Sequence, residues 1–210
     1  TYTSIARNKR NNRKSELILM DLELLGILAK DYPAEELTKL WRDIVLLNQF
    51  HDILPGSSIA EVYDVTKVEY EQLAAEVSGM LKARMEAIAG EGKGVTVFNT
   101  TGFDRSDVVN LGQLNATALA DSMGNLYPIQ QTADGAVAYV KNLPAKGYRT
   151  YALSEAQADS PFVREDDYHL ETPFYSIALD ENGHFTSIYD KENEREILKA
   201  GKPGNMLRLY

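Results

Sequence analysis

Apolar residues recur at helical spacing from the start of the chain to about residue 90. The first stripe comprises Leu17, Met20, Leu24, Ile27 and Leu28. A second stripe follows the helix-breaking run Asp31-Tyr32-Pro33 and comprises Leu37, Leu40, Ile44 and Leu47, with His51 next on the same face. A third begins at Ser57 or Ser58 and comprises Ile59, Val62, Tyr70, Leu73, Val77, Leu81, Met85 and Ile88. The pattern predicts a bundle of three amphipathic helices, the third opened by a capping box of Ser58 and Glu61.

From Val95 onward the hydrophobic period shortens to two, which is typical of short strands. We expect strands at residues 95–98, 137–140 and 148–153. Turn signals with Gly or Asn, which adopt positive φ at low cost, separate the apolar runs at residues 123–125, 133–135, 145–147 and 180–183. This half of the chain therefore predicts an antiparallel β-sandwich.

The predicted fold class is α+β multidomain, with a three-helix bundle followed by a truncated antiparallel β-sandwich-type region. The glycine-rich residues 90–94 form the main predicted linker, and residues 157–159, followed by Pro161, form a weaker one. The domains are then 1–90 (bundle), 95–157 (β-sandwich unit) and 162–210 (start of a further β domain). Because Thr1 is not a methionine and residues 206–210 resemble the middle of a strand, we expect both ends to be internal to a longer protein.

Composition narrows the possible partners. The formal charge of −9 opposes binding to phosphate backbones, so nucleic acid is not expected as a partner. No apolar run approaches the roughly 18 residues of a membrane span, so no membrane partner is expected either. The absence of cysteine excludes thiolate metal sites and is compatible with a reducing compartment, so a cytoplasmic location is the default prediction.

The residues best suited to chemistry lie at the end of the second predicted helix. Asn48, His51 and Asp52 are three and four residues apart, so on a helix their side chains share one surface. A neutral imidazole binds zinc, and the adjacent carboxylate can contact sugar hydroxyls or orient a ligand. On spacing alone, a core histidine followed by a turn carboxylate explains the pattern more simply.

The chain by itself does not supply a complete site. A zinc ion needs three or four ligands, yet the only other histidines, His169 and His184, lie far along the sequence in the β region. No pair of carboxylates is distinguished as acid and nucleophile of a glycosidase. The basic cluster at residues 7–14 is more simply a solvated or docking surface than a phosphate site, and Trp41 and Phe50 are expected in the core. Residues 55–58 have two interpretations that the sequence supports equally. Their backbone amides could be directed at a ligand, or the segment could simply connect two helices.

The run NQFHDILPGSS, residues 48–58, resembles the histidine-aspartate segment of family 38 glycoside hydrolases, the α-mannosidases. Agreement continues on both sides of it. Tyr2-Thr3-Ser4 with Lys9-Arg10 and Asn12-Arg13 resembles the entry to the helical bundle of that family. Residues 97–99, 143–148 and 188–191, with Arg195-Glu196, resemble its β region, so the resemblance extends over essentially the whole chain.

The resemblance implies that the chain is an internal part of a zinc-dependent retaining α-mannosidase that hydrolyses terminal α-linked mannose from oligosaccharides or glycoconjugates. It implies His51 as a metal ligand and Asp52 as a substrate-binding carboxylate. It places the other zinc ligands and the nucleophile on a catalytic domain before residue 1, so no catalytic residue is expected here and the fragment alone should be inactive. The implied partners are a mannose-containing glycan and that catalytic domain. A homo-oligomer is a separate prediction that the resemblance does not supply.

A noncatalytic carbohydrate-binding or assembly module is the alternative hypothesis. In that case His51 is structural. Exposure of His51 beside Asp52 favours the mannosidase interpretation, and complete burial of His51 favours the alternative.

Overall fold

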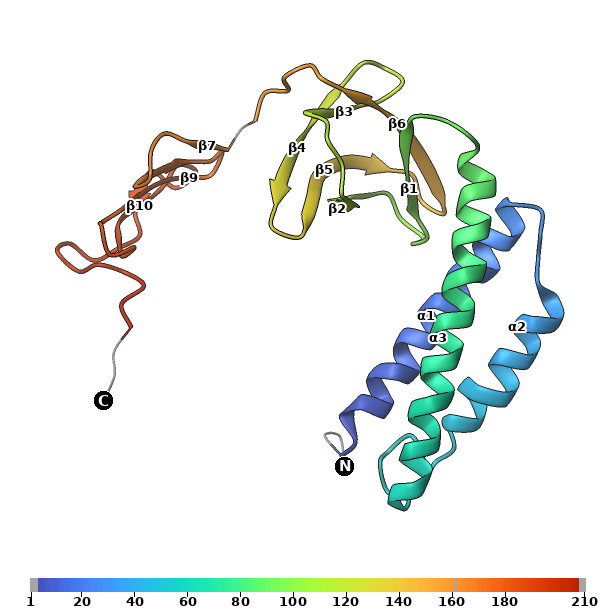
Figure 1. Cartoon of the computed structure of the whole chain (residues 1–210). Coiled ribbons are helices and arrows are strands. Elements are labelled where there is room, and N and C mark those ends of the chain that lie inside the picture. Colours follow the sequence, from blue (N-terminus) through green and yellow to red (C-terminus); the bar gives the residue numbers. More distant parts are fainter. Residues whose placement is uncertain (1–3, 161, 208–210) are drawn as a thin grey trace.

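The computed structural model describes residues 4–160 and 162–207 (Figure 1). The predicted features that involve Tyr2, Thr3, Pro161 and residues 208–210 lie outside these described residues. Helices occupy the first part of the chain and antiparallel sheets the rest, which confirms the α+β class. Within the described residues, no helix is long and apolar enough to cross a membrane.

Three helical segments pack together in the first ninety residues. They are α1 (Ala6–Leu28), α2 (Ala34–Leu40), which continues into the π-helix η1 (Trp41–Leu46), and α3 (Ala60–Ala89). Their shared core comprises Leu19, Leu22, Leu37, Leu40, Val45, Leu73 and Val77. α1 and α3 are the helices in most extensive contact, and α2 with η1 lies beside them (Figure 1).

The predicted buried face of α1 is wrong. Leu17, Met20 and Ile27 are exposed, whereas the buried residues of this helix are Asn8, Asn12, Ser15, Leu19, Leu22, Leu25 and Gly26. Residues 17–28 are apolar on almost every side, so helical spacing selects more than one face there. The buried face of α1 begins with the polar residues Asn8, Asn12 and Ser15 in the first half of the helix. A search for apolar residues does not detect that part of the face.

The π-helix shifts the buried face of the second helical segment by one residue. A regular α-helix places Ile44, Leu47 and His51 in line with Leu37 and Leu40, as predicted from the sequence. In the structure the buried residues after Leu40 are instead Val45, 0% exposed, and Asn48, 2% exposed, while Leu47 is 55% exposed. Ile44 is still partly buried against the core, but one extra residue in a π turn rotates everything after it by about 100°, which is why the predicted face is wrong for Leu47 and His51.

The start of α3 also differs from the prediction. Ile59 precedes the helix in an extended conformation and no side chain caps it, so the capping box of Ser58 and Glu61 is not formed. The amide of Ser58 donates instead to the hydroxyl of Tyr63 at 2.9 Å. Tyr70, Leu73 and Val77 are buried as predicted, and Ile59 is exposed.

The first β region is one six-stranded antiparallel sheet in the order β1-β6-β3-β4-β5-β2. Its strands are β1 (Gly94–Asn99), β2 (Arg105–Gly112), β3 (Ala118–Ala120), β4 (Leu126–Thr132), β5 (Gly135–Leu143) and β6 (Gly147–Ser154). β1 also contacts β2 and β5, so the sheet curls over its own core. That core comprises Leu119, Tyr127, Ala138, Val140, Leu143 and Tyr151.

A five-stranded antiparallel sheet follows, in the order β11-β10-β9-β8-β7. Its strands are β7 (Val163–Arg164), β8 (His169–Glu171), β9 (Tyr175–Leu179), β10 (Phe185–Asp190) and β11 (Arg195–Glu196). The three strands predicted from the sequence are confirmed as parts of β1, β5 and β6. The predicted turns are also formed, with positive φ at Gly124, Gly135, Lys146 and Gly183.

Candidate functional site

His51 and Asp52 lie on the turn that follows the second helical segment, and both side chains are exposed to solvent. The imidazole is 78% exposed and the carboxylate 61% exposed. Nε2 of His51 lies 3.4 Å from Oδ2 of Asp52. The ring of Phe50 packs against the imidazole with the centroids 4.2 Å apart, and Phe50 is itself exposed rather than in the core as predicted. The structure thus presents a histidine and a carboxylate together at the surface.

Asn48 does not join this pair. Its side chain points into the bundle, where Nδ2 donates to Oε2 of Glu69 on α3 at 2.8 Å. The next residue, Gln49, donates from Nε2 to Oε1 of Glu16 on α1, also at 2.8 Å. The prediction that Asn48 shares a surface with His51 is therefore corrected, because the π-helix turns Asn48 inward and the helix ends before His51.

The turn after Asp52 is tied to the bundle through its carbonyl groups. Nζ of the half-buried Lys9 donates to the carbonyl of Pro55 at 2.9 Å and to that of Ser4 at 2.7 Å. The buried hydroxyl of Tyr63 donates to the carbonyls of Asp52 and Ile53 at 3.3 and 3.2 Å. Lys9 is thus a structural clamp, not part of a phosphate site. Residues on both sides of the His51–Asp52 pair are fixed by α1 and α3.

The interior behind the turn is polar. The hydroxyl of Tyr70 donates to Oδ1 of Asn12 at 3.2 Å, and Nδ2 of Asn12 donates to Oε1 of Glu16 at 2.9 Å. Burial, followed by the negative charges of Glu69 and Glu16, raises the pKa of Tyr70 well above its ordinary value. Tyr70 therefore stays protonated at neutral pH and acts as a hydrogen-bond donor.

The pair has the chemistry of a partial zinc site. Two ligands that share a tetrahedral zinc ion with bonds of about 2.1 Å lie roughly 3.4 Å apart. The distance between Nε2 of His51 and Oδ2 of Asp52 matches that spacing, and it also fits a direct ion pair. No three His, Cys, Asp or Glu side chains gather into a metal site anywhere in residues 4–160 and 162–207. A zinc ion bound by this pair would therefore need further ligands from outside these residues.

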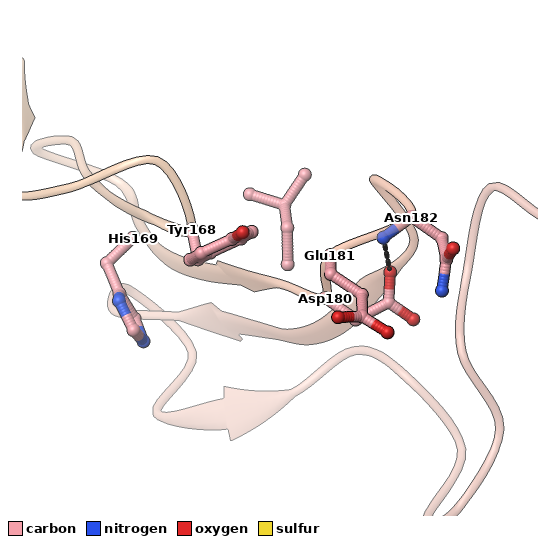
Figure 2. Close-up of a pocket in the computed structure, with 6 residues that line it drawn as sticks. Tyr168, His169, Asp180, Glu181 and Asn182 are labelled. Carbon is pink, nitrogen blue, oxygen red and sulfur yellow. Dashed lines mark hydrogen bonds between the residues drawn. The ribbon is translucent and has the colours of Figure 1, made fainter.

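A second surface feature is a shallow hollow of about 470 Å³ on the five-stranded sheet (Figure 2). Tyr168, Asp180 and Glu181 line it. The carboxylate of Asp180 accepts hydrogen bonds from the amides of Asn182 and His184 at 2.8 and 3.0 Å, which keeps its pKa below the ordinary value. Because this carboxylate already holds the turn, the hollow is a weaker candidate site than the His51–Asp52 pair.

Sequence reasoning did not find the residues that support the turn. Lys9 and Tyr63 contact backbone carbonyls, which are the same in every sequence and so leave no pattern of partner residues. Glu69 lies on α3, which has several other acidic residues, and neither its position nor that of Glu16 on α1 is distinguished by a motif. Trp41 was assigned to the core, and in the structure it is half-buried and donates from Nε1 to Glu23 at 3.0 Å.

Comparison with known proteins points to one family. Residues 1–88 match the family model of the α-mannosidase middle domain. Human α-mannosidase 2C1 is 31% identical over all of this chain, which covers 20% of that protein. An α-mannosidase of Saccharomyces cerevisiae is 47% identical over 70 residues, which cover 30% of this chain and 6% of that protein. The chain thus spans about a fifth or less of the length of these curated relatives.

The fold has a match among solved structures. A glycosyl hydrolase family 38 protein from Enterococcus faecalis aligns with 92% of this chain and 30% of its own, with a TM-score of 0.58 and 14% identity. At that identity the match concerns the fold alone. It includes both the helical part and β regions, because 92% of the chain extends well past α3.

Proposed function

The chain belongs to the family 38 α-mannosidases, and on that premise we propose that it forms part of a zinc-dependent retaining enzyme. The proposed reaction is hydrolysis of terminal α-linked mannose from oligosaccharides or glycoconjugates. The observation that carries the proposal is the exposed His51–Asp52 pair, held on a fixed turn within the residues that match the α-mannosidase middle domain.

In this proposal His51 is a metal ligand and Asp52 binds the substrate. The imidazole of His51 is exposed to solvent and so can bind an ion whose remaining ligands come from another part of the protein. A zinc ion bound there would act as a Lewis acid on sugar hydroxyls. The Asp52 carboxylate, next to the imidazole, accepts hydrogen bonds from hydroxyl groups of a sugar. The clamps hold the backbone of the turn that carries both groups, and metal and sugar sites need such a fixed support.

The remaining catalytic parts are assigned to protein outside residues 1–210. Retaining glycosidases use two carboxyl groups about 5 Å apart, one as nucleophile. We assign the nucleophile and the other zinc ligands to an N-terminal catalytic domain, so residues 1–210 alone are expected to be inactive. A mannose-containing glycan as substrate, assembly into a homo-oligomer and a cytoplasmic location remain predictions of the same proposal.

The alternative, a noncatalytic carbohydrate-binding or assembly module, requires a structural histidine. His51 is instead exposed on 78% of its side chain, and its ring contacts only a similarly exposed Phe50 among the aromatic residues described. A histidine that holds a core together is enclosed by its neighbours. The exposure therefore supports a ligand-binding role.

The proposal is tested with His51→Ala in the full-length protein. Zinc content is measured by mass spectrometry and activity by hydrolysis of an aryl α-mannoside. The matched control is His169→Ala, because His169 is also an exposed histidine paired with an aspartate, Asp166, at 2.9 Å. We expect the His51 variant to lose zinc and activity together while it stays folded, and the control to keep both. Retention of zinc and activity in the His51 variant would overturn the assignment.

A further inference from the structure

The helical segment before His51 leaves the regular α-helix although its apolar residues favour staying in it. A regular helix places Ile44 and Leu47 on the buried face, whereas in the structure Ile44 is only partly buried, Leu47 is exposed and Asn48 is buried. Burial of an amide in place of a leucine is unfavourable unless the amide is hydrogen-bonded. π turns are rare, and many of them occur at functional sites. The deviation thus calls for an interaction that holds the segment in this register.

Two polar contacts hold the end of the segment. Glu69 accepts a hydrogen bond from the buried amide of Asn48, and Glu16 accepts one from Gln49, each at 2.8 Å. A hydrogen bond between an amide and a carboxylate is about twice as strong as one between neutral groups. Both contacts are formed in the π register, and in a regular helix the side chains of residues 48 and 49 are rotated by about 100° from these directions.

The register sets the direction in which the chain leaves the helix toward His51. In a regular helix His51 continues the line of Leu37 and Leu40 into the interior between α1 and α3. With the π turn the chain leaves the helix after Asn48, and His51 lies in a turn with its ring in solvent. The contact that fixes Asn48 is therefore three residues away from the side chain whose direction it determines.

We propose that Glu69 is a positioning residue for the His51–Asp52 site and that it acts through Asn48. This proposal rests on the proposed function, because it takes His51 to be a metal ligand. Removal of Glu69 leaves the buried amide of Asn48 without its acceptor, and the segment gains by burying Leu47 instead. His51 then turns toward the bundle and its imidazole is no longer held in place for an ion.

The test measures zinc affinity of the full-length protein by competition with a chelator, and the zinc concentration that gives half-maximal hydrolysis of an aryl α-mannoside. Loss of an outer partner of a metal ligand typically weakens metal binding by about 10- to 100-fold, and we expect that loss for Glu69→Ala. Glu69→Gln keeps an oxygen acceptor and is expected to lose less. Excess zinc should restore part of the activity of both variants.

Two controls separate positioning from general stability. Glu71→Ala removes a carboxylate from the same helix that only pairs with Lys67 at the surface, so it should not change zinc affinity. Val77→Ala opens a cavity in the core without a contact to the turn and should lower the melting temperature with zinc affinity unchanged.

The outcomes are distinct. Loss of zinc affinity in Glu69→Ala beyond that of Val77→Ala, with partial recovery in Glu69→Gln, supports the proposal. Zinc affinity equal to wild type in Glu69→Ala, or equal to that of Val77→Ala, overturns it. If His51→Ala also keeps its zinc, the proposed function has failed as well; if that variant loses zinc, only the positioning role is wrong.

Discussion

The shift of the buried face by the π-helix makes a quantitative prediction for two neighbouring residues. Val45 is fully buried and Leu47 is 55% exposed. Val45→Ala removes two buried methyl groups, worth about 0.8 kcal/mol each, and leaves a small cavity, so the expected loss of unfolding free energy is about 2 kcal/mol. Leu47→Ala removes a larger side chain but, because that side chain is in solvent, should cost no more than about 0.5 kcal/mol.

The chain contains a single tryptophan, Trp41, which begins the π-helix. Its fluorescence during urea unfolding therefore reports on this segment without a signal from the sheets. With an m-value of about 1.5 kcal/mol/M, Val45→Ala should lower the urea midpoint by more than 1 M and Leu47→Ala by a few tenths. If Leu47→Ala is the more costly of the two, the segment is a regular α-helix and the argument for the direction of His51 is wrong.

Three further predictions concern other parts of the structure. Tyr70→Phe should cost about 1 to 2 kcal/mol in the same urea titration, because it leaves the buried Oδ1 of Asn12 without its donor; an unchanged midpoint would contradict the polar interior. Gly56→Ala should lower the midpoint by a similar amount, because φ is +89° and a Cβ would stand 2.6 Å from a backbone oxygen; a tolerated alanine would show that the turn adopts another conformation. The hydrogen bond that the protonated His169 donates to the Asp166 carboxylate raises the pKa of His169, so this contribution to stability is present below pH 6.5 and is lost as the pH rises through the folded-state pKa; NMR titration should show a fall of that pKa toward 6.5 in Asp166→Asn.

The β half of the chain was predictable from short-range signals. Glycine and asparagine mark turns because few other residues adopt positive φ at low cost, and Gly135 and Gly183 do adopt it. Between such turns, the alternation of apolar and polar residues allows few pairing registers for strands such as β5 and β6. The order of the strands was not predictable, because β1 pairs with β6, more than forty residues away along the chain, through backbone groups common to all residues.

In the helical half, the presence of the helices was predictable from the sequence, but the face that each helix buries was not. Helical spacing identified α1, and yet the run from residue 17 to residue 28 offers apolar residues to every side. The sequence around residue 44 has no proline or glycine to indicate the π turn, so the one-residue shift that buries Val45 more completely than Ile44 depends on tertiary contacts. Helical spacing grouped His51 and Asp52 with Asn48, which the structure does not confirm, and the roles of His51 and Asp52 came from the resemblance of the surrounding motif.

The candidate site lies at the end of the helical bundle where the core changes from apolar to partly polar. Toward one end the core is made of leucine and valine, as at Leu22 and Val77, while toward the His51 turn the buried residues include Asn12 and Asn48. Apolar contacts tolerate a slip of one residue when leucines surround the helix, as they do near Leu47. Directional hydrogen bonds do not, because a slipped amide is left buried and unpaired. A polar core at this end gives up some hydrophobic stabilisation and, in return, permits only one direction for the turn that carries His51 and Asp52.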